Sequence, residues 1–97
     1  MTYSKKIVLL SRSGYVPERD EDFLRQLCSD GVRLFCVLGA DVDKWEEALD
    51  WIGLDQGSAE PHFITTTSHI DESLAEVIEF AQLFDTGEKA DVQVLER

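Results

Sequence analysis

The chain has 97 residues, a length suited to one domain, and 43% of them are hydrophobic, which argues against general disorder. Its net charge of −11, from 20 acidic and 9 basic residues, repels phosphate backbones and anionic lipids, so we expect no nucleic-acid or membrane partner. No apolar run has the length of a membrane-spanning helix, and Ile7–Leu10 is too short for a signal peptide. We therefore expect a cytoplasmic protein.

The first predicted unit is a strand over Lys5–Ser11 and a helix that starts at Pro17 or Asp20 and ends at Asp30. The strand is continuously apolar at its centre, which is typical of a strand covered by helices on both faces. The helix carries an apolar stripe at helical spacing, formed by Phe23, Leu24, Leu27 and Cys28.

The second predicted unit is an apolar strand over Val32–Leu38 and a helix that ends at Gly53, with Trp45 on its inward face. The third is a strand over His62–Thr67 and a strongly periodic helix that ends near Phe84. A final alternating segment, Asp91–Glu96, is typical of an edge strand.

Strands that alternate with helices predict a parallel sheet with right-handed crossovers. We therefore expect a single α/β domain over residues 1–97, in the order β-α-β-α-β-α-β. It should be a three-layer sandwich with a four-stranded, mainly parallel sheet, and this arrangement resembles small Rossmann-like or flavodoxin-like domains. Two helices should cover one face and one helix the other.

The simplest strand order for such a sheet is 2-1-3-4. That order leaves the very apolar second strand at an edge, where an uncovered strand invites association. Either the order differs, or something covers this edge, for example a second copy of the chain.

Ligands of parallel α/β sheets usually bind where the strands end at their carboxyl edge. In the order 2-1-3-4, the loops after the first and third strands would meet there, beside the loop after the second. A ligand-binding group of Arg12, Ser13, Tyr15, Asp41 and His69 is the resulting hypothesis, with Arg12 orienting an anion and His69 as the acid–base group. The alternative is that these are ordinary capping and loop residues.

Specific chemical motifs are missing from the sequence. It has neither of the glycine-rich phosphate-binding patterns and no Gly-x-Ser-x-Gly, so we assign no catalytic residue and no cofactor. His62 and His69 lie at opposite ends of one predicted strand and cannot share a metal ion. Cys28 and Cys36 form no metal-binding pattern, and we interpret both as small buried side chains.

Trp51 lies six residues after the inward-facing Trp45 and points substantially elsewhere, so it either covers the helix edge or contacts a partner. Together with the charge and the missing catalytic motifs, this favours a protein-interaction module. Such a module would self-associate as a homodimer or bind a basic protein. The alternative is a small-molecule or anion-binding domain, possibly enzymatic, at the carboxyl edge of the first and third strands.

Overall fold

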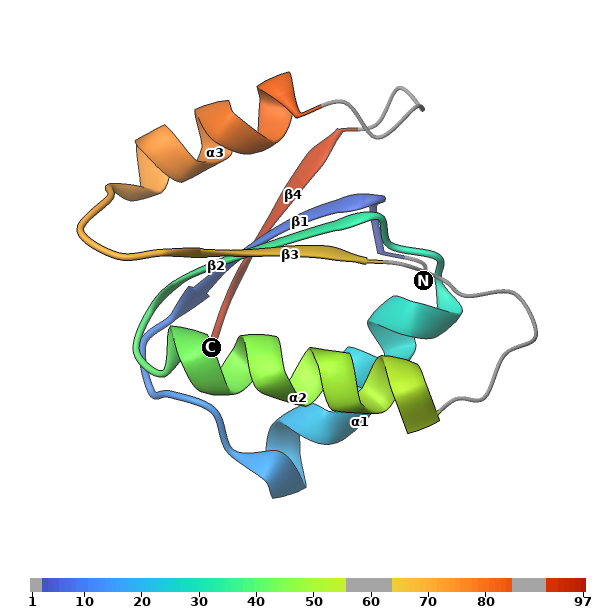
Figure 1. The fold of residues 1–97 in the computed structure, drawn as a ribbon. Coiled ribbons are helices and arrows are strands. Elements are labelled where there is room, and N and C mark those ends of the chain that lie inside the picture. The colour runs from blue at the N-terminus through green and yellow to red at the C-terminus, as the bar shows by residue number, and fades with distance from the viewer. Residues whose placement is uncertain (1–2, 56–63, 85–90) are drawn as a thin grey trace.

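A computed structural model of the chain describes residues 3–55, 64–84 and 91–97. The described elements form three layers, with α1 and α2 below the sheet and α3 above it (Figure 1). The α/β class, the element order and the split of two helices against one are therefore confirmed. The elements are β1 (Lys6–Ser11), α1 (Pro17–Ser29), β2 (Leu34–Gly39), α2 (Val42–Asp55), β3 (Thr65–His69), α3 (Leu74–Leu83) and β4 (Val92–Glu96).

The sheet is parallel throughout, with the strand order β3-β2-β1-β4. The predicted order 2-1-3-4 is therefore wrong. Of the two alternatives for the apolar second strand, the different order is the one observed, because β2 lies between β1 and β3. The chain steps in one direction from β1 to β3, so right-handed crossovers place α1 and α2 on the same face. It then crosses back to β4, and this reversal places α3 on the opposite face.

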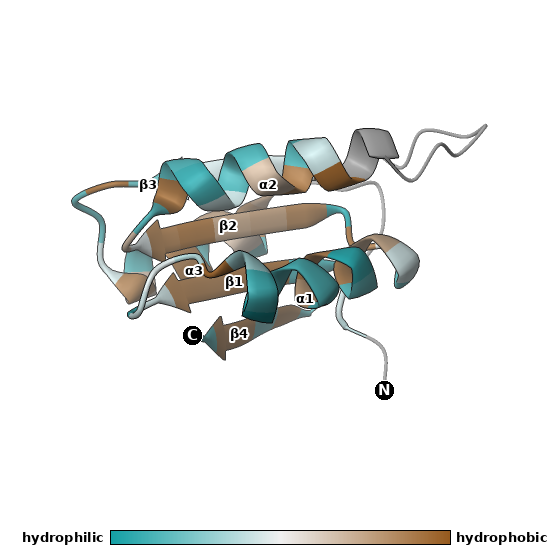
Figure 2. Cartoon of the chain, turned by 90° about the horizontal axis from the view of Figure 1, so that it is seen from below, coloured by the Kyte–Doolittle hydropathy of each residue, from teal (hydrophilic) through white to brown (hydrophobic). Residues whose placement is uncertain are grey.

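Each face of the sheet has its own hydrophobic core, since side chains alternate along the strands. The larger core lies under α1 and α2 and is centred on Trp45, which is fully buried between Phe23 and Phe35. The smaller core lies under α3, where Val77 and Ala81 pack on apolar residues of β1 and β2. Figure 2 shows the apolar strands behind the polar outer surfaces of α1 and α2.

Three element ends reflect local chemistry. Gly31 adopts a left-handed φ of 74° directly after Asp30, the C-cap of α1, a position that favours glycine. The predicted end of the second helix is wrong, because α2 passes through Gly53 to Asp55. α3 starts at a capping box, in which the Ser73 hydroxyl accepts from the Glu76 N–H at 3.2 Å and the Glu76 carboxylate accepts from the Ser73 N–H.

The third strand extends two residues beyond its predicted end, to His69, and its predicted start at His62 lies outside the described residues. It consists of Thr65-Thr66-Thr67-Ser68-His69 and is more polar than β1 and β2. This composition fits a strand at the edge of the sheet, where fewer side chains are buried.

Candidate functional site

The loop after β1 is joined to the loop after β2 at the carboxyl edge of the sheet. The Ser11 carbonyl accepts the Ala40 N–H at 2.8 Å, and the Asp41 carboxylate accepts the Tyr15 N–H at 3.1 Å. The indole N–H of Trp45 donates to the Ser11 hydroxyl at 2.9 Å. The β1 loop is therefore anchored to the start of α2 through both backbone and side chains.

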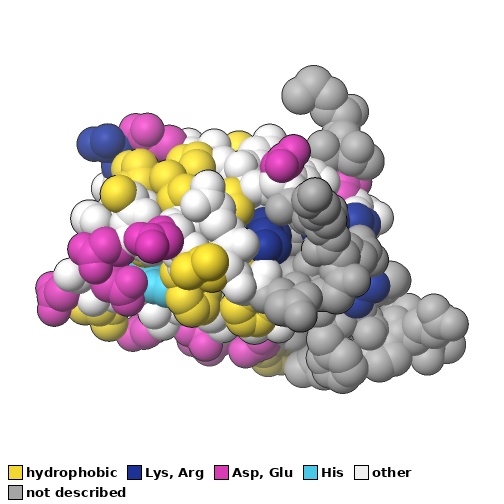
Figure 3. Space-filling view, turned by 90° about the horizontal axis from the view of Figure 1, so that it is seen from above, with side chains coloured by type: hydrophobic (Ala, Val, Ile, Leu, Met, Phe, Trp, Pro, Cys, Tyr) yellow, Lys and Arg dark blue, Asp and Glu magenta, His cyan; other side chains and the backbone are white. Residues whose placement is uncertain are grey.

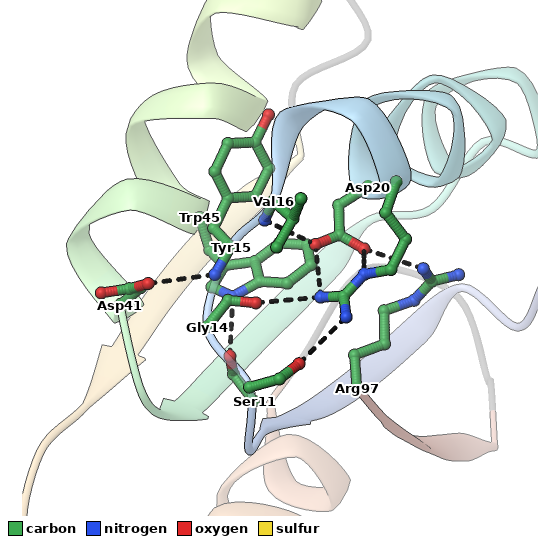
Figure 4. A network of polar contacts seen from close by, with 10 residues as sticks. Ser11, Gly14, Tyr15, Val16, Asp20, Asp41, Trp45 and Arg97 are labelled. Carbon is green, nitrogen blue, oxygen red and sulfur yellow. Dashed lines mark hydrogen bonds and ion pairs between the residues drawn. The ribbon is translucent and has the colours of Figure 1, made fainter.

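Asp20, in the first turn of α1, binds the end of this loop that leads into the helix. Its side chain is fully buried, and it accepts hydrogen bonds from the Val16 N–H at 2.9 Å and from Arg97 at 2.8 Å. Arg19 binds both of its oxygens at 2.7 Å. The Arg19 guanidinium also donates to the Ser13 hydroxyl and the Gly14 carbonyl, both at 3.0 Å, so one cation spans the loop (Figure 4).

Burial alone would raise the pKa of Asp20, because it disfavours the charged carboxylate. The hydrogen bonds from Arg19, Val16 and Arg97 outweigh that effect, and the pKa is lowered from its usual range. Arg97 also stacks on the Phe23 ring, with 4.1 Å between its guanidinium carbon and the ring centroid. The ionised carboxylate thus joins α1 to the residue that follows β4.

A groove of about 590 Å³ runs between α1 and α2 beside this anchored loop. Tyr15 lies at its loop end, where its ring packs edge-on against Trp45 with 5.0 Å between the ring centroids. Trp51 lies further along α2 and is 69% exposed, which settles its position as a surface residue. The other lining residues are Pro17, Ala48 and Ile52, with the charged side chains of Glu21, Arg25, Lys44 and Glu47.

Acidic side chains outnumber basic ones on the exposed surfaces of α1 and α2, while the groove itself is lined by two acids and two cations. Within residues 17–52 of α1 and α2, the exposed acidic side chains are Glu18, Glu21, Asp22, Asp43, Glu47 and Asp50. The two lining cations each lie near an acid: Arg25 binds Glu21 at 3.1 Å, and Lys44 lies 4.0 Å from Asp41. The pKa of Tyr15 is raised, first by burial and then by the negative charges of Glu21, Asp20 and Glu18.

The structure places three of the five predicted ligand-binding residues in the anchored loops. Asp41 has a left-handed φ of 59° and binds the Tyr15 backbone, while Ser13 binds Arg19. The side chain of Arg12 contacts β4 instead, where it forms an exposed ion pair with Glu96. These contacts occupy polar groups that the ligand hypothesis would use.

His69 lies apart from these residues. It is at the end of β3, which β2 separates from β1, and its side chain is on the α3 face of the sheet. It is 7% exposed, with Nε2 at 2.8 Å from the Thr67 hydroxyl and Nδ1 at 3.1 Å from the Glu72 carboxylate. Its ring packs on Phe80 of α3, with 5.0 Å between the centroids. Because β1 and β3 are not neighbours, the β1 and β3 loops do not form a common crevice there.

Sequence reasoning missed Asp20, Arg19 and Arg97. In the sequence, Asp20 looks the same as Glu18, Glu21 and Asp22, which favour the positive end of the helix dipole equally well. Helical spacing offers one signal, because Asp20 lies three residues before Phe23 and four before Leu24, on the buried side of α1.

Both cysteines are buried and unpaired by disulfide, and burial raises the pKa of each thiol. Among the described residues, no three His, Cys, Asp or Glu side chains are grouped so that they could hold a metal ion. In that same part of the chain, every helix is too short or too polar to cross a membrane.

Comparison with known proteins identifies one family. Residues 1–95 match the family described as a domain of unknown function, DUF7684. No curated protein and no solved structure matches the chain.

Proposed function

The chain belongs to the DUF7684 family, and we propose that it is a protein-interaction domain that binds a basic, amphipathic segment of another protein in the groove between α1 and α2. The observation that carries this proposal is Trp51, a large aromatic side chain that is 69% exposed at the edge of a groove. Tryptophan is among the residues most enriched at the energetic centres of protein interfaces.

The chemistry of the groove supports a segment with both apolar and cationic side chains. Tyr15, Pro17, Ala48 and Trp51 offer apolar surface to one side of a bound helix or strand. Glu21 and Glu47 line the groove, and the other exposed acids of α1 and α2 add to the negative charge of the two helices, which increases the rate of encounter with a basic partner.

The anchored loop gives the groove a fixed shape. Tyr15 is held by Asp41 through its backbone and by Trp45 through its ring. A preorganised surface loses less conformational entropy when it binds, so more of the contact energy contributes to affinity.

The first experiment uses a synthetic helical peptide of leucine and lysine as the probe, with fluorescence anisotropy as the readout. We expect binding that weakens as salt is raised, and an affinity at least about tenfold lower for Trp51→Ala. Val94→Ala removes an exposed apolar side chain from β4 and serves as the matched control, which should bind like the wild type. Equal affinity in the two variants would contradict the groove as the site.

A second peptide separates charge recognition from simple hydrophobic binding. The same sequence with glutamate in place of lysine should not bind, because it carries the same sign of charge as the chain, whose net charge is −11. Binding of both peptides with equal affinity would contradict the basic partner while leaving the apolar groove in place.

The small-molecule alternative rests on Arg12 and His69, which the fold separates. A ligand that binds the wild type and loses affinity in both Arg12→Ala and His69→Ala would favour that alternative over the groove.

A further inference from the structure

β3 lies at an edge of the described sheet and carries neither charged side chains nor proline. It pairs with β2 on one side and is the last strand of the described sheet in that direction. Natural edge strands are commonly blunted by charged side chains or proline. β3 contains no Asp, Glu, Lys, Arg or Pro over Thr65–His69, whereas β4 at the other edge includes Glu96, which is paired with Arg12.

The backbone of β3 has hydrogen-bonding groups directed away from β2. The Thr65 N–H donates to the Arg33 carbonyl on the β2 side at 2.9 Å. Successive residues of a strand direct their N–H and C=O groups to opposite sides. The N–H and C=O groups of Thr66 and Ser68 therefore point toward the outer edge.

Exposed apolar side chains lie beside this edge. Phe80 of α3 packs on His69 of β3 and is 37% exposed. Ile70 directly follows β3 and is 67% exposed. Figure 3 shows apolar side chains gathered near the histidine on the α3 face, with acidic groups around them.

We propose that a second copy of this chain binds along β3, so that two sheets join through antiparallel β3 strands around a two-fold axis. Centred on Thr67, this register places Thr66 of one copy opposite Ser68 of the other. Each of these residues would then exchange its outward N–H and C=O with its counterpart. Ile70 directly follows β3 and Phe80 contacts its last residue, His69, so these two exposed apolar side chains lie close to the joined strands and can be covered in the same contact.

The composition of β3 favours a second copy over a foreign strand. In an antiparallel pair centred on Thr67, each strand faces the same few residues of its copy, so a strand with Asp, Glu, Lys or Arg at its centre would bring like charges together. β3 avoids this, although each chain carries a net charge of −11. The remaining long-range repulsion is screened by salt, so this association should strengthen as ionic strength rises.

The test is sedimentation velocity on the intact chain across a concentration series, at about 0.05 M and about 0.5 M salt, where the screening length differs about threefold. We expect a reversible dimer whose dissociation constant falls at the higher salt. A wild-type chain that stays monomeric at both salts and at every concentration would overturn the proposal. Binding of a basic peptide in the groove should weaken under the same change, so the two proposals succeed or fail separately.

Ser68→Pro removes one outward N–H without removing a bond to β2, and should weaken dimerisation at least about tenfold. Val94→Pro is the matched control at the other edge. The Arg97 N–H donates to the Leu10 carbonyl, so the N–H of Val94 points away from β1. Val94→Pro should dimerise like the wild type, and circular dichroism checks that both variants fold.

A third variant leaves the backbone of β3 intact. Ile70→Glu replaces a 67% exposed side chain directly after β3, so the monomer should fold normally while the dimer weakens. Amide exchange gives an independent readout, in which Thr66 and Ser68 become protected as the concentration rises. A dimer that Val94→Pro disrupts and that both Ser68→Pro and Ile70→Glu leave intact would overturn the assignment to β3.

Discussion

The two faces of the sheet differ in the size of their hydrophobic cores and in how many helices cover them. The face under α1 and α2 has two helices, a fully buried tryptophan and a buried carboxylate with its hydrogen bonds satisfied. The face under α3 has one helix, a smaller core and several exposed apolar side chains. Among the described elements, the single helix α3 therefore covers less of the four-stranded sheet than α1 and α2 do together.

Replacing Asp20 with alanine should have a large effect on the two-helix face. The change leaves the Arg97 cation, the Arg19 cation and the Val16 N–H without their common acceptor. We expect a loss of about 3 kcal/mol in the free energy of unfolding, measured with urea, because several hydrogen bonds to a charged group are lost while the two arginines, 41% and 29% exposed, regain contact with water.

Asp22→Ala is the control, since Asp22 lies two residues further along α1 and is exposed. Its effect should stay within about 0.5 kcal/mol. Similar losses for the two variants would mean that Asp20 contributes no more than its exposed neighbours.

A pair of core truncations compares the two faces directly. Leu24→Ala, in the larger core where Leu24 is fully buried, should cost about 3 kcal/mol. Ile78→Ala, at the margin of the smaller core, should cost about 1 kcal/mol, because a half-buried side chain loses less surface and leaves no closed cavity. Urea unfolding measures both, and equal losses would show that the α3 face is packed as tightly as the other.

Acidification should produce the smallest of these effects and act mainly on the two-helix face. The pKa of Asp20 is lower in the folded chain than in the unfolded chain. The ionised Asp20 carboxylate therefore stabilises the folded chain fully at pH values above its pKa in the unfolded chain, near 4. This stabilisation is lost as the pH falls through its pKa in the folded chain. A protonated carboxyl still accepts hydrogen bonds, so the loss should be smaller than in Asp20→Ala.

Urea midpoints measured between neutral pH and pH 2 test this sign. Asp20→Asn should reduce the fall in stability at low pH without abolishing it. The pKa of Asp30 is also lowered, through the Tyr3 N–H and then Gln26, and Asp30 remains in this variant. An Asp20→Asn variant with the full wild-type pH dependence would assign the acid sensitivity to other groups.

The sequence predicted the fold class, the order of the elements and the burial of Trp45, because each follows from local periodicity. Strand order depends on long-range pairing, and the simple assumption that β1 neighbours β3 was wrong. The polar composition of Thr65–His69 was the available signal, because a strand at an edge buries less side-chain surface than β2 does.

The candidate site was less predictable for the same reason. Trp51 was identified as a possible contact, while its groove depends on how α1 and α2 pack. Asp20 was missed because Arg97, one of its partners, lies 77 residues away in the chain. Ligand binding by Arg12, Ser13, Tyr15, Asp41 and His69 stays a prediction.

The contact between Asp20 and Arg97 has a consequence for how the chain folds. β4, near the end of the sequence, pairs with β1, near its beginning. Arg97 follows β4 and contacts the buried Asp20 carboxylate only when β4 is paired with β1. A partly folded species without β4 would hold Asp20 with fewer compensating hydrogen bonds, and this raises its free energy. Detachment of β4 should therefore coincide with global unfolding, and amides of β4 and the first turn of α1 should exchange with solvent together.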